Sequence, residues 1–324
     1  MSCKLTFPPI SVVIIGLNAS VHIQSCIESV FACNYPQEQI EIIYVDGGSS
    51  DQSVALAKVY DQVKVIELNS DRPSPGKGRN VGLSYASHNY VQFLDSDTQL
   101  DSNWLAQAVG ILKNSEIASV SGNLDEVFPE KNFYHRVANL EWCNKTYEGY
   151  SQTFGGIVLV KKNLVEELGG YDENTHVGED PDLSFRMHLK GYRHYKLAIP
   201  MVEHDINMTS FKRYMKRCIR SGYGYALLGL RYRHTKEKLW FDKLLKRILR
   251  VFLVLFIASI TYFIYPSLAF VLFFLLSFKD TILWFRWKKR YQLSVSRSIE
   301  YGFHLDLANF FQFIGISHYF FRNV

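Results

Sequence analysis

The sequence predicts an α/β fold, a mostly parallel sheet flanked by helices, followed by a C-terminal helical region that associates with a membrane. Two patterns predict it. Short apolar runs rich in β-branched residues alternate with segments of helical periodicity through the first hundred residues, as in a parallel sheet covered by helices. Later, residues 251–278 contain no charged side chain and are long enough for a membrane helix. A chain of 324 residues, 48% of them hydrophobic, has room for both parts.

The predicted elements of the first part alternate between strand and helix. They are a strand at Ile10–Ile15, a helix at Val21–Ala32, a strand at Ile40–Val45, a helix at Ser53–Tyr60, a strand at Val63–Glu67, a glycine-rich loop at Pro75–Asn80 that opens a helix through Ala86, and a strand at Val91–Leu94. Ligands of such sheets bind beyond the carboxyl ends of the strands. Five polar side chains fall at those ends or in the following loops: Asn18, Asp46, Lys77, Arg79 and Asp95. Their joint placement predicts a nucleotide or phosphate site.

Each of these loops is also compatible with a turn that binds nothing, because Asp, Asn, Ser and Gly favour turns. Gly76-Lys77-Gly78 is not a Walker phosphate loop, since its spacing differs and no Ser or Thr follows the lysine. It does not match the dinucleotide-binding pattern G-x-G-x-x-G either.

Two carboxylates, Asp95 and Asp97, follow the fourth strand in the stretch YVQFLDSDTQL. On a continuing strand, side chains at this spacing point to opposite faces, but a turn directs both into one cleft. Carboxylate oxygens are the ligands that a hard divalent cation prefers, and such a cation keeps positions open for phosphate oxygens. The alternative is a solvated turn.

At this point the motifs resemble a known family. The stretches ISVVIIGLN, IEIIYVDGGSSD, GKGRNVGLSYA and YVQFLDSDTQLDSNWL resemble, in this order, the motifs of the family 2 glycosyltransferases of the GT-A fold. The resemblance continues through GGYDENTHVGEDPDLSFRMHLKGYR and covers roughly residues 9–225. Two positions depart from the family pattern: Gly16 stands in place of the usual Pro, and Gly47 in place of a second Asp.

The resemblance implies an inverting transfer of a sugar from a UDP- or GDP-linked donor to an acceptor hydroxyl. It assigns Mg²⁺ or Mn²⁺ to Asp97 with Asp95, and donor binding to Asn18 and to Asp46 with Lys77 or Arg79. By the same resemblance Asp180 is the general base, with Glu179 as the runner-up. An acceptor hydroxyl attacks usefully only as a carboxylate removes its proton. The alternative for the acids of GEDPD is capping of the helix predicted at Ser184–Lys190, and Asp182 fits that alternative.

Three further side chains have two interpretations each. His204 ends a strand predicted at Ala198–His204, and is either structural or a third metal ligand, as some relatives have a metal-binding His there. Arg217 and Arg220 lie on a basic helix predicted at Lys212–Arg220, where they either clamp the donor diphosphate or face anionic lipid.

Basic clusters flank the apolar stretch on both sides, and positively charged flanks favour the cytoplasm. We therefore expect a hydrophobic hairpin at about 245–287, turning at Pro266, or a re-entrant pair, rather than a single span. Tyr301–Phe321 is predicted to be an interfacial helix. The expected domains are residues 1–230, catalytic, and 231–324, membrane-associated, placed at the cytoplasmic face of the inner membrane.

The expected partners are a nucleotide-sugar, a lipid-linked or glycan acceptor and membrane lipid. Nucleic acid is not expected, because the basic residues flank apolar segments. The five cysteines form no C-x-x-C pair, which argues against a zinc site and a disulfide framework, and no signal peptide is visible. Two alternatives to glycosyl transfer are a sugar-1-phosphate nucleotidyltransferase and a non-catalytic assembly subunit with the same fold.

Overall fold

The computed structural model describes residues 7–70, 72–142, 147–175 and 177–322. The chain divides into two compact units. The sheet unit comprises residues 1–129 and 141–206, and the helical unit comprises residues 130–140 and 207–324. The main division therefore falls at residue 206, whereas the expected domain boundary was at residue 230. The physical reason is that helix α8 (Phe211–Arg231) packs against helices α9 and α13 of the C-terminal region.

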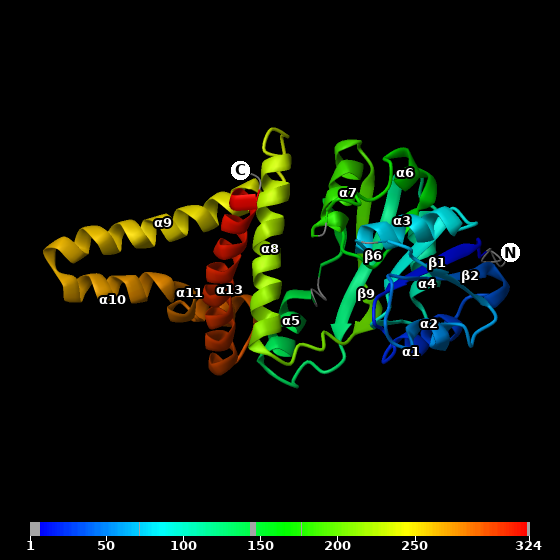
Figure 1. Cartoon of the computed structure of the whole chain (residues 1–324), viewed down its shortest axis with the longest axis horizontal. Helices are drawn as coiled ribbons and strands as arrows, with labels where there is room; N and C mark the ends of the chain where they lie inside the picture. Colours follow the sequence, from blue (N-terminus) through cyan, green and yellow to red (C-terminus); the bar gives the residue numbers. More distant parts are fainter. Residues whose placement is uncertain (1–6, 71, 143–146, 176, 323–324) are drawn as a thin grey trace. The chain divides into compact units, whose positions relative to one another are not determined.

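The sheet unit contains nine strands within the described residues, in the order β3-β2-β1-β4-β8-β6-β9-β5, with β7 also paired to β9 (Figure 1). The strands are β1 (Ile10–Gly16), β2 (Ile40–Asp46), β3 (Val63–Glu67), β4 (Tyr90–Asp95), β5 (Thr98–Leu100), β6 (Ile117–Glu126), β7 (Gly149–Ser151), β8 (Val158–Lys161) and β9 (Arg193–His204). Strands β1, β2, β3, β4, β6 and β9 run in one direction, and β5, β7 and β8 run against them. The predicted mostly parallel sheet is confirmed.

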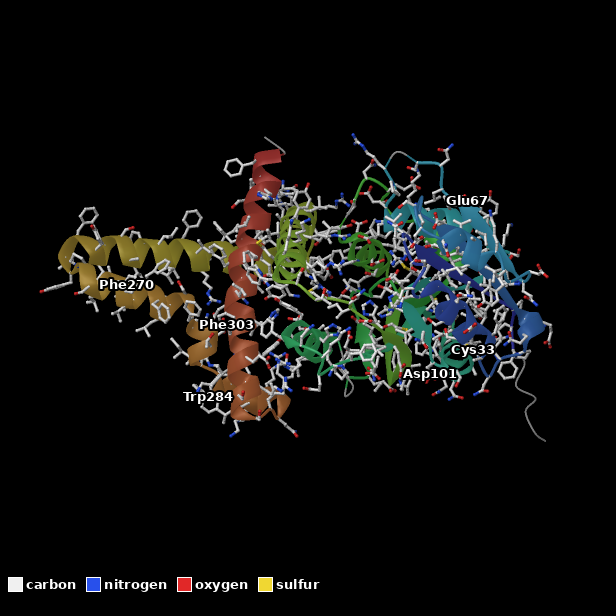
Figure 2. The ribbon with its side chains drawn as sticks, turned by 60° about the horizontal axis from the view of Figure 1, so that its bottom comes forward. Cys33, Glu67, Asp101, Phe270, Trp284 and Phe303 are labelled. Carbon is white, nitrogen blue, oxygen red and sulfur yellow. The ribbon has the colours of Figure 1, made fainter. Side chains whose placement is uncertain are left out.

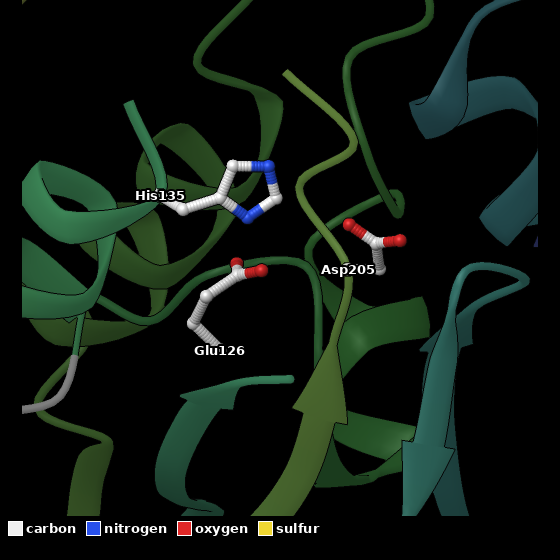
Figure 3. Close-up of side chains that lie close together, drawn as sticks. All are labelled: Glu126, His135 and Asp205. Atoms are coloured by element: carbon white, nitrogen blue, oxygen red, sulfur yellow. The ribbon is translucent and has the colours of Figure 1, made fainter. Parts of the chain in front are cut away.

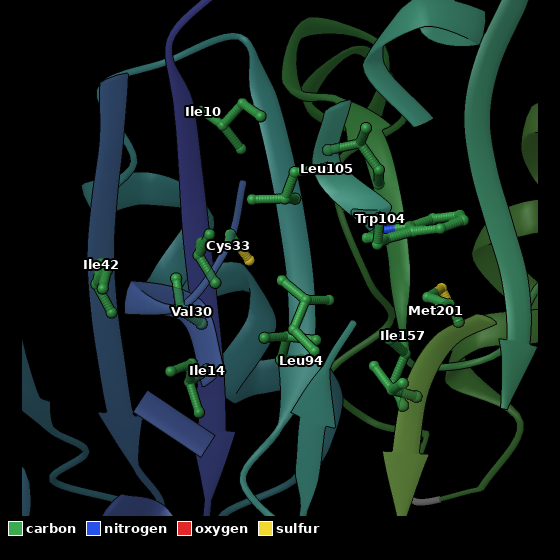
Figure 4. Close-up of a cluster of buried hydrophobic side chains, with 14 of the residues drawn as sticks. Ile10, Ile14, Val30, Cys33, Ile42, Leu94, Trp104, Leu105, Ile157 and Met201 are labelled. Carbon is green, nitrogen blue, oxygen red and sulfur yellow. The ribbon is translucent and has the colours of Figure 1, made fainter. Parts of the chain in front are cut away.

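Strand β1 shows why the sequence has continuous apolar runs. Its alternate side chains enter two different cores, one containing Ile10, Val12 and Ile14, and the other containing Val13 and Ile15. The first core lies under α1 (Ile23–Phe31) and α4 (Trp104–Leu112), where Trp104 and Leu105 pack (Figure 4). The second lies under α3 (Pro75–Tyr85), α6 (Lys162–Glu167) and α7 (Glu179–Leu189). A strand covered on both faces is therefore apolar at nearly every position.

Parallel register brings the chemistry-bearing ends together. Within β1, Gly16 lies opposite Asp46 of β2, and Ile15 lies opposite Asp95 of β4. The loops after these strands therefore share one edge of the sheet, as the sequence predicts.

Several helix boundaries differ from the sequence-based expectation, among them those of α3, α7 and α2. The stretch predicted as a glycine-rich loop, Pro75–Asn80, forms the first two turns of α3. Ser74 caps this helix by accepting from the backbone N–H of Lys77, and Pro75 occupies a first-turn position where no N–H is needed. Helix α7 begins at Glu179 rather than at Ser184, after Gly178, whose φ of 85° favours glycine. The short helix α2 (Ser53–Ala57) ends three residues before the predicted end.

The helical unit contains most of α5 (Phe133–Trp142), together with α8, α9 (Phe241–Ile264), α10 (Pro266–Ser277), α11 (Lys279–Ile282), α12 (Phe285–Tyr291) and α13 (Val295–Arg322). Helices α8 and α13 approach closely at two glycines. An added Cβ would lie 2.0 Å from the carbonyl oxygen of Gln312 at Gly222, and 1.9 Å from that of Ile219 at Gly315. Small residues at both positions let the two backbones meet.

Helices α9 and α10 form a hairpin that turns at Tyr265 and Pro266, as expected (Figure 1). Helix α9 is the one helix within the described residues that is long and apolar enough to cross a membrane. Large apolar side chains of both helices are exposed, among them Phe270, which projects from α10 (Figure 2). At the base of the hairpin, Arg250 of α9 forms ion pairs with Asp280 of α11 and Asp306 of α13.

Candidate active site

The D-S-D stretch is a turn between two strands. Asp95 ends β4, and Ser96-Asp97 leads into β5, which runs antiparallel to β9 with Thr98 opposite His204. This pairing places Nε2 of His204 3.4 Å from Oδ2 of Asp97. The side chain of Asp97 is 44% exposed and that of His204 is 14% exposed, so the pair lies at the surface of the sheet edge. The structure thus brings together two of the three predicted metal ligands, which are distant in the sequence but lie on paired strands.

The electrostatics of these groups are coupled. Burial acts to raise the pKa of Asp97, but the hydrogen bond and positive charge of His204 outweigh it, so that pKa lies below its ordinary value. Burial acts to lower the pKa of His204, and the hydrogen bond and charge of Asp97 raise it overall. Burial raises the pKa of Asp95, although Arg79 opposes this shift.

Arg79 lies at the centre of the remaining acids. Its side chain is 2% exposed, and Nη2 donates to Oδ1 of Asp95 at 2.8 Å. On its other side, Nη1 lies 3.1 Å from Oδ1 of Asp180 and 3.6 Å from Oε1 of Glu179. Burial acts to lower the pKa of Arg79, but the surrounding carboxylates outweigh it and raise that pKa further. A single buried cation therefore connects the D-S-D turn with the first turn of α7.

The surroundings of Arg79 come from segments that sequence reasoning did not assign to the site. The guanidinium carbon lies 5.6 Å from the ring centroid of Tyr171. Asn80 holds that tyrosine in place, because its side chain accepts from the Tyr171 N–H and donates to the Tyr171 carbonyl. A Cβ added at Gly156 would lie 2.1 Å from Nη2 of Arg79. The order of the GKGRN, FGG and GGY motifs in the sequence could have indicated that these segments belong to one site. That they contact one another depends on the tertiary structure.

Asp46 is buried and shapes its own loop. Its Oδ2 accepts from the backbone N–H groups of Gly48 at 2.9 Å and Ser49 at 2.7 Å. Its Oδ1 accepts from the hydroxyls of Tyr44 at 2.9 Å and Ser49 at 2.5 Å. Both oxygens are therefore engaged in organising the loop after β2. The predicted donor contact of Asp46 stays a prediction.

Asn18 and Lys77 also bond within this edge of the sheet. Oδ1 of Asn18 accepts from the Ser50 N–H at 2.9 Å, which connects the loops after β1 and β2. Nζ of Lys77 donates to Oγ of Ser70 at 2.9 Å.

The two departures from the family motifs, Gly16 and Gly47, are hydrogen-bonded to each other, with the Gly47 N–H donating to the Gly16 carbonyl at 2.7 Å. A Cβ at Gly16 would lie 2.6 Å from Oγ of Ser96, so the turn itself excludes a side chain at this position.

Two carboxylates that sequence reasoning missed lie close together at the ends of neighbouring strands. Glu126 ends β6 and Asp205 follows β9, and their carboxylate oxygens lie within 4.8 Å of one another (Figure 3). The backbone N–H of Ile206 donates to Oε2 of Glu126 at 3.2 Å. Oxygen ligands at this spacing suit a divalent cation. Nothing in the local sequence signalled the pair, because 79 positions separate its members.

Comparison with known proteins now identifies the family. A family model described as glycosyl transferase family group 2 matches residues 90–278, more than half of the chain, and one described as glycosyl transferase family 2 matches residues 11–163. The chain is a family 2 glycosyltransferase. The resemblance inferred from the motifs is thereby confirmed.

This glycosyltransferase is similar to curated proteins with several different names. It is 24% identical to glycosyltransferase AglE of Haloferax volcanii over 58% of this chain and 64% of that protein. It is 24% identical to β-monoglucosyldiacylglycerol synthase of Trichormus variabilis over 72% and 54%, and 28% identical to poly-β-1,6-N-acetyl-D-glucosamine synthase of Staphylococcus aureus over 54% and 45%. The chain thus spans about half to two thirds of the length of these relatives.

Solved structures of similar fold contain bound nucleotide-sugars. TarS of S. aureus in complex with UDP-GlcNAc superimposes with a TM-score of 0.52 at 17% identity, over 67% of this chain and 66% of that one. The mannosyltransferase PcManGT of Pyrobaculum calidifontis, in complex with GDP-Man and Mn²⁺, superimposes with a TM-score of 0.58 at 17% identity, over 94% and 86%. At these identities the likeness shows the fold, and the predicted GT-A fold class is confirmed.

The remaining predicted residues of this glycosyltransferase lie in the helical unit. Arg217 and Arg220 are exposed side chains of α8, three positions apart and hence on one face of the helix. Their predicted role as a diphosphate clamp stays a prediction.

Proposed function

We propose that this protein is an inverting glycosyltransferase that moves a sugar from a nucleotide diphosphate donor to a hydroxyl of a lipid-linked or glycan acceptor, at the cytosolic face of the membrane. The observation that carries the proposal is the convergence of the D-S-D turn and the E-D pair on Arg79 at the carboxyl edge of the sheet. This edge is where parallel α/β sheets bind their ligands.

Asp97, Asp95 and His204 are the residues that hold Mg²⁺ or Mn²⁺ in this proposal. The donor set fits, since Asp97 is partly exposed at the sheet edge and the imidazole nitrogen of His204 lies beside it. Carboxylate oxygens suit Mg²⁺ and Mn²⁺, and His204 would add a nitrogen ligand to this set. When bound, the cation offsets the charge that develops on the leaving nucleoside diphosphate. The Mn²⁺ and GDP-Man bound to PcManGT support this choice.

Asp180 is the proposed general base, and it lies in the first turn of α7. Its side chain is 16% exposed, so it is shielded but reachable from the sheet edge. Glu179 is 8% exposed, which makes it the less accessible of the two carboxylates. Accessibility therefore favours Asp180, because a base must reach the acceptor hydroxyl.

The acceptor assignment rests on the relatives and on the exposed apolar hairpin. The printed names of two relatives denote a glycolipid synthase and a polysaccharide synthase. Exposed apolar side chains along α9 and α10, with basic residues at the base of the hairpin, fit a membrane surface. A lipid-linked or growing glycan acceptor is available at such a surface.

The test is a panel of UDP- and GDP-sugars with Mn²⁺, membrane lipid extract and glycan acceptors, read out as release of nucleoside diphosphate. We expect release with one donor class, and its loss in EDTA and in Asp97→Ala. The matched control is Asp61→Ala, an exposed acid in the turn before β3, which should retain activity. Activity that survives EDTA and Asp97→Ala would refute the metal role. Consumption of a nucleoside triphosphate with pyrophosphate release would instead identify a nucleotidyltransferase.

A further inference from the structure

The buried guanidinium of Arg79 contacts two acids that have different roles in the proposed reaction. It donates a hydrogen bond to one and forms an ion pair with the other. Nη2 contacts Asp95, which belongs to the D-S-D turn that binds the donor in the proposal, and Nη1 contacts Asp180, the proposed base. These carboxylates lie 85 positions apart in the sequence.

The shape of arginine explains why this residue type is needed here. Its planar guanidinium presents separate N–H groups in fixed directions, so one side chain can bind two carboxylates at a defined separation. A lysine ammonium is a point charge that lacks this fixed fork. The hydrogen bond to Asp95 joins ionised partners and is roughly twice as strong as a neutral one, whereas the contact with Asp180 is an ion pair at 3.1 Å.

The guanidinium has little freedom to move. It is 2% exposed, Tyr171 faces it at 5.6 Å, and Gly156 leaves just enough room for Nη2, since an added Cβ would lie 2.1 Å away. The tip of Arg79 therefore sits in a closed space at the meeting point of α3, β4 and α7. The tip is shielded from solvent, and the donor contact that the sequence suggested for Arg79 stays a prediction.

We propose that Arg79 is a positioning residue that sets the separation of Asp95 from Asp180, and that Gly156 is required because it leaves space for the tip of the guanidinium. The inference rests on the proposed roles of Asp95, Asp97 and Asp180. Arg79 touches neither substrate in this proposal and acts through the two carboxylates. Misplacing a reacting group by about 1 Å lowers a rate on the order of 10²-fold, which sets the size of the expected effect.

The first experiment compares two neighbouring glycines in the purified full-length protein. In Gly156→Ala the new methyl group displaces the tip of Arg79 without removing its charge, and we expect kcat to fall on the order of 10²-fold with donor KM within about threefold. Gly155→Ala is the matched control, because nothing lies within 4 Å of a Cβ added there. It should retain wild-type kcat. Equal kcat in the two variants would overturn the inference.

The second experiment separates positioning from a purely structural role. If Arg79 acts through Asp180, then Arg79→Lys lowers kcat strongly in the wild-type background and by less than about threefold in the Asp180→Asn background, since residues that act as a unit are non-additive. Effects that multiply would show that Arg79 acts independently of Asp180 and overturn the inference. A raised nucleotide dissociation constant with unchanged kcat would do the same, because it would mark Arg79 as a donor contact.

A second arginine, Arg186, provides the control for a general loss of packing. Arg186 of α7 pairs with Asp182 and donates to the carbonyls of Leu168 and Gly170, so it is also a partly buried structural cation beside the site. Arg186→Lys should lower the melting temperature and leave kcat unchanged. If Asp97→Ala and Asp180→Asn are themselves fully active, the proposed function fails. If they are inactive and Gly156→Ala is active, only the role of Arg79 fails.

Discussion

At the scale of the residue, the structure distinguishes acids that the sequence presents as equivalent. Glu179, Asp180 and Asp182 all occupy the first turn of α7, where acids are favourable near the helix N-terminus. Asp180 is near Arg79 and partly accessible, whereas Asp182 is 1% exposed and accepts from Nε of Arg186 at 2.9 Å. The helix cap residue is Gly178, and it makes no side-chain cap bond. Asp182 is thus a partner in a buried ion pair and not the helix N-cap that the sequence suggested.

Asp180→Asn should lower kcat by about 10²–10⁴-fold with donor affinity close to wild type. The amide retains the shape and the hydrogen-bond acceptor of the carboxylate but cannot take a proton. Steady-state kinetics together with nucleotide titration measure both quantities. Asp182→Asn is the control, and should lower stability on the order of 3 kcal/mol, because it removes one partner of a buried ion pair, while sparing kcat. A normal kcat in Asp180→Asn together with a lowered kcat in Glu179→Gln would instead assign the general base to Glu179.

The pair of His204 and Asp97 predicts a dependence of stability on pH. Interaction with Asp97 raises the pKa of His204 in the folded protein. The stabilisation is therefore fully present below the ordinary His pKa of about 6.5, and it is lost as the pH rises through the higher folded value. In metal-free buffer, the melting temperature of wild type should exceed that of His204→Gln by more at pH 6 than at pH 9. A difference that grows with pH would contradict the pairing.

At the scale of the element, α3 packs closely against the sheet, and this packing places Arg79 beside Asp95 and Asp180. Gly82 of α3 lies over Val13 of β1, and an added Cβ would be 2.2 Å from Cγ1 of that valine. Gly78 packs against Ile15 in the same way, at 3.3 Å. Gly78, one of the two glycines in the stretch predicted as a loop, is therefore a position at which the helix meets the strand.

Gly82→Ala should destabilise the protein by about 1–3 kcal/mol, since the methyl group has no space and must push α3 from the sheet. Gly110→Ala is the matched control on the exposed side of α4, where nothing lies within 4 Å of the added Cβ. There, alanine should stabilise by about 0.5–1 kcal/mol through its higher helix propensity. Chemical denaturation measures both values. Equal effects of the two substitutions would show that α3 does not contact β1 as described.

At the scale of the whole molecule, the lengths of the hairpin helices bear on how the chain meets a membrane. The charge-free part of α9 runs from residue 251 to residue 264, which is 14 residues and about 21 Å at 1.5 Å per residue. Helix α10 has 12 residues, or about 18 Å. Both are shorter than the roughly 30 Å hydrocarbon core. Helix α9 reaches the length of a span only when its charged first turns are included. Of the two topologies that the sequence left open, the charge-free lengths favour a re-entrant pair with its apex inside the bilayer.

The apex should therefore be inaccessible from outside the cell. A membrane-impermeant maleimide should not label Tyr265→Cys in intact cells, whereas Phe285→Cys, an exposed position at the start of α12, should be labelled once the membrane is permeabilised. The described native cysteines, Cys26, Cys33 and Cys218, are buried and give little background. Labelling of Tyr265→Cys in intact cells would instead show a hairpin that crosses completely.

Most of the fold follows from local pattern. The bounds predicted for the strand Val63–Glu67 match those of β3. It is a short segment rich in β-branched residues, and turn residues lie near both of its ends. The loop predicted at Pro75–Asn80 was wrong because backbone propensity alone cannot show that Ile15 requires the small size of Gly78. The sites of Asp95, Asp97 and Asp180 came from motif order, which the family match supports.

The sequence by itself determined the class of fold and the family, because apolar periodicity and motif order are local properties. Motif order also singled out the candidate acids, whose roles stay predictions. Tertiary structure alone decided that Arg79 is a buried partner of Asp95 and Asp180, and that His204 lies beside Asp97. It also decided the pairing of Glu126 with Asp205. Apart from Arg79 with Asp95, these contacts join residues about 80 or more positions apart, and such contacts depend on strand order and on which glycine leaves space for which side chain. A one-dimensional pattern contains neither, since many pairings satisfy the same local propensities.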